Sequence, residues 1–239
     1  MDFRVHFKRK RKRLLNLNKL EAFPICEYKG VFNGLAVEVV NTEQATIAAL
    51  YDNGGYGKGS LSRGDPNSGN PAETLLLGLE EACLLAYFVE KLQISDQAGN
   101  QMSWTVFVQT ALEYDPQFIY KLAAYLYLKS KNWIVKSGIK FGGDFLIYKQ
   151  GPMHFHASFL VIVQSPSEET SSHFVAKNLK GVQRVAETSD KDVLLLSVKT
   201  TLDFNPLLAT RETLASLAIE ETVIRRFNYT FFVQSKQKQ

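Results

Sequence analysis

The apolar residues of this chain recur with two different periods, and the change of period along the chain predicts its elements. In the first hundred residues, the β-branched run GLAVEVV at 34–40 predicts a strand, and alanines at helical spacing in 43–54 predict a helix. Residues 72–92 are apolar on almost every face and predict a long, buried helix. Two segments rich in Gly, Ser, Asn and Gln, 56–71 and 93–103, predict loops.

The second half alternates helical and extended patterns more densely. Two helical segments come first, then three strand-like runs joined by short glycine-containing turns, then a helix with one apolar face, and finally two strand-like runs. In chain order these segments are residues 104–114, 116–131, 133–138, 143–149, 155–163, 174–189, 192–199 and 220–234. This order predicts a mixed sheet flanked by helices.

The pattern as a whole predicts an α/β (α+β) protein in two parts. We expect a basic N-terminal arm at 1–27, a small α/β domain at 28–100 and a mixed-sheet domain flanked by helices at 101–239. The last run, at 220–234, is apolar and rich in aromatic residues. At a sheet edge such a strand needs cover from another chain, unless it pairs only internally. Both arrangements fit the pattern.

Composition narrows the class of protein. Hydrophobic residues make up 45% and charged residues 22% of the 239, as in ordinary globular proteins, and no apolar run reaches the roughly 20 residues of a membrane span. Much of the net charge of +4 comes from the unbroken basic block Lys-Arg-Lys-Arg-Lys-Arg at 8–13. The block is typical of a nuclear address or an RNA-binding arm, and equally of a solvated tail. Two cysteines cannot form a disulfide framework, which favours a reducing compartment.

One hairpin concentrates the candidate chemistry. The stretch FGGDFLIYKQGPMHFHA at 141–157 contains Tyr148, a Gly-Pro turn, and the histidines His154 and His156. Tyrosine and histidine at hairpin ends are often packing residues with a satisfied polar tip, and a lysine before an apolar strand, such as Lys191, is usually a solvated end. Taken singly, these residues do not decide between packing and an active site.

Taken together, three segments resemble one family in the same order along the chain. The segments are LYDNGGYGKGSLSRGDP at 50–66, KSGIKFGGDFLIYKQGPMHFHASFLVIV at 136–163 and LKGVQRVAETSDKDVLLLSV at 179–198. They resemble the tRNA-splicing (tRNA-intron) endonucleases, and the first segment resembles the eukaryotic catalytic subunit assigned to the 5′ splice site. The similarity extends from about residue 28 to about residue 230.

The resemblance implies a restriction-endonuclease-like catalytic domain with the triad Tyr148, His156 and Lys191. It also implies RNA cleavage without a metal or any other cofactor, in which a 2′-OH attacks the adjacent phosphorus and leaves 2′,3′-cyclic phosphate and 5′-OH ends. In that family the tyrosine is the proposed base, the histidine protonates the leaving 5′-oxygen, and the lysine stabilises charge on the phosphorane.

These residue types suit the reaction unequally. Histidine ionises near neutrality and is well placed as an acid. Tyrosine, with a reference pKa of about 10, is only about one part in a thousand ionised at pH 7, a deficit near 4 kcal/mol. A neighbouring Lys191 ammonium would favour the phenolate. By pKa alone His156 would be the base, so the assignment of Tyr148 rests on the resemblance.

Two arginines are candidates for RNA contact. Arg184 lies on the predicted helix where the family places an arginine that stacks on a base; the alternative is a surface ion pair with Glu187. Arg226 belongs to the Arg-Arg-Phe triplet at 225–227, which resembles an Arg-Arg-Trp triplet of the family. Because Phe227 lacks the indole N–H, the resemblance at this point is incomplete.

Three further features have a simpler reading. His154 and His156 form a His-Xaa-His pair, but no further ligand has metal-like spacing, so we expect a turn or surface role for His154 and no metal site. Asp144 could orient Lys191 or the hairpin backbone, or it could be a strand-start residue bonded to local amides. Gly57, Lys58, Gly59 and Arg63 form a glycine-broken basic loop without the strand and the Gly-Lys-Ser/Thr of a nucleotide-binding P-loop.

We therefore expect a nuclear endoribonuclease subunit that cuts precursor tRNA, assembled with a second catalytic subunit and two structural subunits, with no membrane partner. The alternative is a non-catalytic subunit of the same complex that docks tRNA, although such a subunit is expected to lack the triad. A third possibility is a general RNA-binding module that depends on the basic arm; its binding would be lost on deletion of residues 1–20, whereas the nuclease would still cut at low salt.

Overall fold

The computed structural model describes residues 8, 27–40, 44–66, 70, 72–152, 154–166, 181, 184 and 191–225, and within helix α1 it gives no side chains for 44–46, 48 and 49. Several predictions fall on residues outside these ranges: the basic block beyond Lys8, Cys26, most of the helix expected at 174–189, and the end of the last strand with Arg226 and Phe227.

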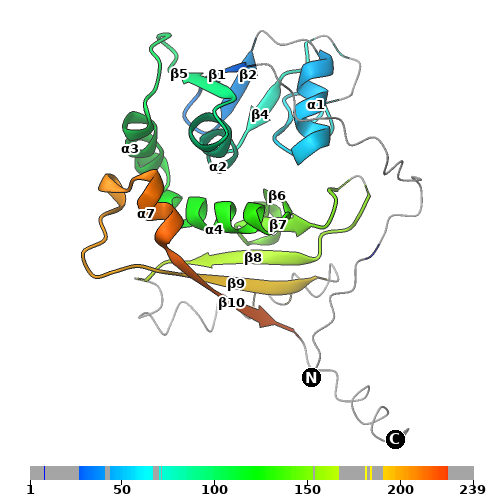
Figure 1. Ribbon diagram of the computed structural model, residues 1–239. Helices are drawn as coiled ribbons and strands as arrows, with labels where there is room; N and C mark the ends of the chain where they lie inside the picture. The colour runs from blue at the N-terminus through cyan, green and yellow to red at the C-terminus, as the bar shows by residue number, and fades with distance from the viewer. Residues whose placement is uncertain are drawn as a thin grey trace, which may run out of the picture.

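The first part of the chain forms a five-stranded mixed sheet in the order β3-β4-β2-β1-β5. Its pairs are antiparallel except β1 with β5, which run parallel. The strands are β1 (Tyr28–Phe32), β2 (Val37–Val40), β3 (Lys58–Gly59), β4 (Leu75–Leu77) and β5 (Leu92–Ser95). Helices α1 (Gln44–Gly54) and α2 (Leu79–Cys83), which continues as the π-helical turn η1 (Leu84–Phe88), lie beside this sheet (Figure 1).

The prediction of one helix over residues 72–92 is wrong at both ends. Leu75–Leu77 form β4, whose residues Leu75 and Leu77 are fully buried and pair with Val39 and Val37 of β2. Gly78, in an extended conformation, separates this strand from α2. A short run of leucines satisfies the strand and the helix pattern equally, and only the partner strand decides between them. The expected loop at 93–103 likewise begins inside β5.

In the second part the predicted helices and strands that the structure describes occur in the predicted order, with three further short elements between them. Helices α3 (Trp104–Tyr114) and α4 (Phe118–Ser130) precede a five-stranded sheet in the order β10-β9-β8-β7-β6, in which only β8 and β9 run parallel. Its strands are β6 (Ile134–Ser137), β7 (Phe145–Tyr148), β8 (Phe159–Gln164), β9 (Asp192–Lys199) and β10 (Ala218–Ile224). The short elements η2 (Ile139–Phe141), η3 (Pro206–Leu208) and α7 (Arg211–Ser216) were not expected.

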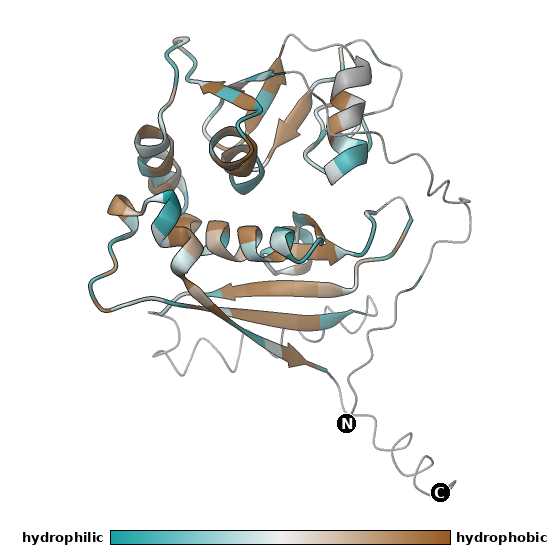
Figure 2. Cartoon of the chain, in the orientation of Figure 1, coloured by the Kyte–Doolittle hydropathy of each residue, from teal (hydrophilic) through white to brown (hydrophobic). Residues whose placement is uncertain are grey.

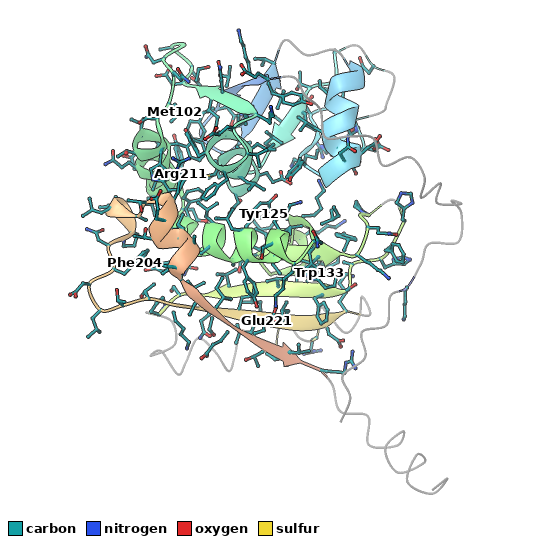
Figure 3. The ribbon with its side chains drawn as sticks, viewed as in Figure 1. Met102, Tyr125, Trp133, Phe204, Arg211 and Glu221 are labelled. Carbon is teal, nitrogen blue, oxygen red and sulfur yellow. The ribbon has the colours of Figure 1, made fainter. Side chains whose placement is uncertain are left out.

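Helix α4 lies between the two parts. It packs on β6, β8 and β9 on one side and on α2 on the other (Figure 1). β8 and β9 are hydrophobic along almost their whole length (Figure 2). Tyr125 of α4, 2% exposed, lies 5.9 Å ring to ring from Phe145, and Trp133 packs edge-on against Phe159 (Figure 3). One continuous apolar core therefore joins the two parts.

These features confirm the mixed α/β (α+β) class, with two mixed sheets and helices against them. The domain limits at 27/28 and 100/101 remain predictions. Within the described ranges, none of the helices combines the length and the apolar character that a membrane crossing requires.

Candidate active site

Strand register brings two of the three predicted catalytic residues, Tyr148 and Lys191, to one edge of the second sheet, where β7 ends and β9 begins. Ile147 of β7 lies opposite Phe159 of β8, which lies opposite Asp192 of β9. Tyr148 follows Ile147 and Lys191 precedes Asp192. Because β7 runs antiparallel to β8 and β9 runs parallel to it, both residues lie on the same side of this row. Because neighbouring strands are about 4.8 Å apart, the Tyr148 and Lys191 backbones are separated by roughly two strand spacings.

Tyr148 and Lys191 also lie on the sheet face that points away from α4. On that face Leu146, Leu160 and Val193 form a small apolar cluster, against which Tyr148 and Phe141 pack. The Lys191 Nζ lies 4.6 Å from the centre of the Phe141 ring, a cation–π contact. Phe141, which precedes the Gly-Gly pair of the hairpin, therefore contributes to the surroundings of both residues.

His156 is presented to solvent by its neighbours. Phe155 and Ala157 are 9% and 7% exposed, and alternation along the extended segment turns the His156 side chain outward. The backbone N–H of His156 donates to the carbonyl of Lys8 at 3.0 Å. The segment that carries His156 is thus bonded to the first residue of the basic block.

Burial opposes ionisation at two of the three residues. Burial raises the pKa of the Tyr148 phenol above its ordinary value and lowers the pKa of the Lys191 ammonium. The tyrosine is therefore the neutral phenol at neutral pH in the absence of RNA. A phosphate placed between the two groups would add negative charge beside Lys191, which favours its protonated form.

The Gly-Gly-Asp motif of the hairpin has a structural role. Gly142 ends η2 in the left-handed region at φ 76°, where glycine is favoured, and a Cβ on Gly143 would lie 2.8 Å from the Val161 carbonyl oxygen. The Asp144 carboxylate accepts from the Val163 N–H at 2.8 Å and lies 3.5 Å from the Lys121 ammonium. Asp144 thus stands at the start of β7 and bonds the backbone of β8, as expected for a residue that holds the hairpin backbone.

The remaining candidates are described only in part or fall outside the described residues. His154 is half-buried in the Gly-Pro turn, and its Nδ1 has no hydrogen-bond partner among the described residues. Arg184 is helical, as predicted, and exposed, while Glu187 and Arg226 fall outside the described residues. In the part of the chain that is described, no three His, Cys, Asp or Glu side chains are grouped as metal ligands.

An ion pair beside Lys191 was missed by the sequence reading. The Arg225 guanidinium, just past β10, holds the Asp192 carboxylate, and its Nε lies 3.0 Å from both Oδ1 and Oδ2. The pair joins the end of β10 to the residue that follows Lys191. No sequence signal pointed to it, because the pairing of Ile224 with Val193 is known only from the fold.

Comparisons with known proteins point to one family. The model of the tRNA intron endonuclease catalytic C-terminal domain matches residues 118–205, a range that includes Tyr148, His156, Arg184 and Lys191. The tRNA-splicing endonuclease of Hyperthermus butylicus is 33% identical over 143 residues, which cover 59% of this chain and 76% of the archaeal protein. That of Sulfurisphaera tokodaii is 31% identical over 160 residues, or 66% and 83%.

Eukaryotic relatives are longer. The rat tRNA-splicing endonuclease subunit Sen2 is 31% identical over 163 residues, which cover 65% of this chain and 34% of the rat protein. The mouse Sen2 subunit is equally similar, with 35% of its length covered. The chain thus spans about a third of the length of these mammalian relatives.

Proposed function

Because this chain belongs to the tRNA-splicing endonuclease family, we propose that it is a catalytic subunit that cleaves intron-containing precursor tRNA, at the 5′ splice site. The observation that supports the proposal is the strand register that brings Tyr148 and Lys191 to one edge of the second sheet, together with the exposed His156 on the segment that leads into β8. The likeness to Sen2 proteins supports the choice among subunits.

In the proposed reaction the substrate supplies its own nucleophile. Tyr148 takes the proton of the 2′-OH, and the 2′-oxygen forms a bond to the adjacent phosphorus. The bond from phosphorus to the 5′-oxygen breaks, and His156 gives a proton to that oxygen. The products are a 2′,3′-cyclic phosphate and a 5′-OH. Holding the attacking and leaving oxygens in line contributes several kcal/mol, and each positioned acid or base roughly 10²- to 10⁴-fold.

Lys191 addresses the difficulty that burial creates for Tyr148. A phenol with a raised pKa is a poor base before substrate binds, but its conjugate base gains stability beside an ammonium. The same ammonium favours the extra charge that develops on the phosphorane oxygens. Phe141, in cation–π contact with Lys191, limits the directions in which the ammonium can point.

The proposal extends to the assembly. We propose a nuclear heterotetramer in which this chain joins a second catalytic subunit and two structural subunits. The likeness to proteins named as subunits supports an assembly of several chains.

The proposed function is tested by measuring whether cleavage depends on the 2′-OH of the nucleotide 5′ of the splice site. The co-expressed assembly is given precursor tRNA with a single 2′-deoxy nucleotide 5′ of one splice site, in the presence of EDTA. We expect the substituted site to resist cleavage while the other is cut, with a cyclic phosphate at the cut end. Cleavage of the deoxy site, or a strict need for added metal, would overturn the mechanism.

A further inference from the structure

The basic loop that follows α1, which contains Gly57, Lys58, Gly59 and Arg63, is held in one conformation by hydrogen bonds. Its backbone closes on itself, since the Arg63 N–H donates to the Gly59 carbonyl and the Gly59 N–H to the Gly64 carbonyl, both at 2.9 Å. Ser60 exchanges bonds with Thr74: its N–H donates to the Thr74 carbonyl, and the Thr74 N–H donates to its Oγ. The loop is thereby fixed to the strand that pairs with β3.

A buried carboxylate occupies the centre of this loop. Glu73 is 3% exposed, and its carboxylate accepts hydrogen bonds from the backbone N–H groups of Leu61 and Ser62 at 2.9 and 3.2 Å. A Cβ on Gly59 would lie 2.3 Å from the Glu73 Oε1, so a side chain at that position would displace the carboxylate. The backbone donors that a phosphate would use are therefore already bonded to the protein's own anion. Any anion recognised by this loop must be recognised by side chains.

Two cationic side chains of the loop project outward. Lys58 and Arg63 are both exposed, and within the described ranges neither has an ion-pair partner. Arg63 adopts φ 57°, a left-handed conformation that costs a non-glycine residue energy unless the surrounding structure enforces it. A glycine at this position would adopt the same backbone conformation with less strain, so the arginine lowers the stability of the folded loop.

The loop is also fixed to the strand beside Tyr148. A Cβ on Gly55 would lie 2.4 Å from the Ile134 Cγ2, and Ile134 is the residue directly opposite Tyr148 in the β6–β7 pair. The Lys136 ammonium donates to the Gly57 carbonyl at 2.5 Å and lies 4.9 Å from the centre of the Tyr51 ring. Chain length then limits the Lys58 backbone to about 20 Å from that of Tyr148.

The helix that precedes the loop also contacts this support through Tyr51, over whose ring the Lys136 ammonium lies. Tyr51 of α1 is buried, and burial, the charges of Asp65 and Asp52, and its proximity to Tyr148 raise its pKa to about 12. Lys58 and Arg63 are carried on a rigid element that shares its support with the proposed active site.

We propose that Lys58 and Arg63 are RNA-contact residues that bind backbone phosphates of the substrate close to the cleaved bond. The proposal rests on the function proposed above for the identity of the RNA. Two fixed cations that contact phosphates position the strand and do not read its sequence. Their role is to hold the RNA beside the triad, so they are positioning residues and take no part in proton transfer.

The experiment measures the salt dependence of RNA binding by the co-expressed assembly. The probe is labelled precursor tRNA with 2′-deoxy nucleotides at both splice sites, so that binding is measured without cleavage. The variants are Lys58→Gln, Arg63→Gly and the double substitution. Arg63→Gly removes the charge while relieving the left-handed backbone, so its melting temperature should be equal or higher. The matched control is Lys29→Gln, an exposed lysine on β1, three strands away from β3.

We expect each substitution to reduce the slope of log Kd against log salt by about 0.7 to 0.9, and the double substitution by about twice that. The control Lys29→Gln should leave both the slope and the single-turnover cleavage rate at the wild-type value. Slopes equal to wild type in the double variant would overturn the proposal. So would failure of that variant to assemble, which would assign the loop to a protein partner. If the variants show the expected slope differences from wild type, but the wild-type assembly does not cut precursor tRNA, the proposed contacts are supported and the proposed function fails.

Discussion

The backbone N–H of His156 and the carbonyl of Lys8 are joined by a hydrogen bond of 3.0 Å. A residue near the start of the chain is thereby bonded to the segment that carries the proposed general acid. The sequence reading treated the basic block only as a polyanion-binding arm or a solvated tail. The bond gives its first residue a structural role beside His156.

This bond predicts a difference between deleting Lys8 and replacing its side chain. Deletion of residues 1–8 removes the carbonyl, and a lost hydrogen bond of about 1 kcal/mol loosens the His156 segment. We expect the single-turnover cleavage rate to fall several-fold. Lys8→Ala keeps the carbonyl and should retain the wild-type rate at saturating enzyme. Equal rates for the deletion and wild type would show that the bond does not position His156.

The Asp192–Arg225 pair predicts a positioning effect on Lys191. Asp192→Asn removes the negative charge that the Arg225 guanidinium binds at the first residue of β9. The neighbouring Lys191 can then shift, and a displacement of even 1 Å at a reacting group can cost about 100-fold in rate. We expect a 10- to 100-fold slower single-turnover rate, with RNA affinity unchanged. Glu220→Gln is the control, because it breaks the exposed pair with Lys199 at the far end of the same two strands. A loss of affinity without a loss of rate would contradict the positioning role.

Glu80 predicts a pH dependence of stability. Burial raises its pKa from 4.5 to about 7, against the opposing charge of Lys121. The folded state then holds the proton more tightly than the unfolded state. Its stabilising contribution is complete below pH 4.5 and is lost as pH rises through about 7. We expect Glu80→Gln to be more stable than wild type at pH 8, by on the order of 1 to 3 kcal/mol, and to show no such gain at pH 4.

Urea unfolding at several pH values measures this difference. Glu212→Gln is the control of opposite sign. The backbone N–H at the start of α7 and the Thr210 hydroxyl lower the pKa of Glu212, so its contribution is present above its ordinary pKa and lost as pH falls. A constant stability difference between Glu80→Gln and wild type from pH 4 to 8 would exclude a raised pKa.

The sequence predicted those elements whose local hydrophobic pattern fits only one type of secondary structure. Short apolar runs predicted β7, β8 and β9, and periodic apolar residues predicted α3 and α4. It failed at Leu75–Leu77, where a short apolar run is a strand only because β2 lies beside it. It also missed the Asp192–Arg225 pair and the Lys8–His156 bond, since both depend on register between segments far apart in sequence. The triad itself was named from a resemblance, and the fold supports it through the register that brings Tyr148 and Lys191 to one edge of the second sheet.

The most direct test of the account is the single-turnover cleavage of precursor tRNA by assemblies in which only this subunit is changed. We expect Tyr148→Phe and His156→Ala to slow the 5′ cut by roughly 10²- to 10⁴-fold, leaving the 3′ cut and RNA affinity unchanged. His154→Ala, two residues away on the same hairpin, should cut both sites at the wild-type rate. If Tyr148→Phe and His156→Ala cut both sites as fast as wild type, this edge of the sheet is not the active site.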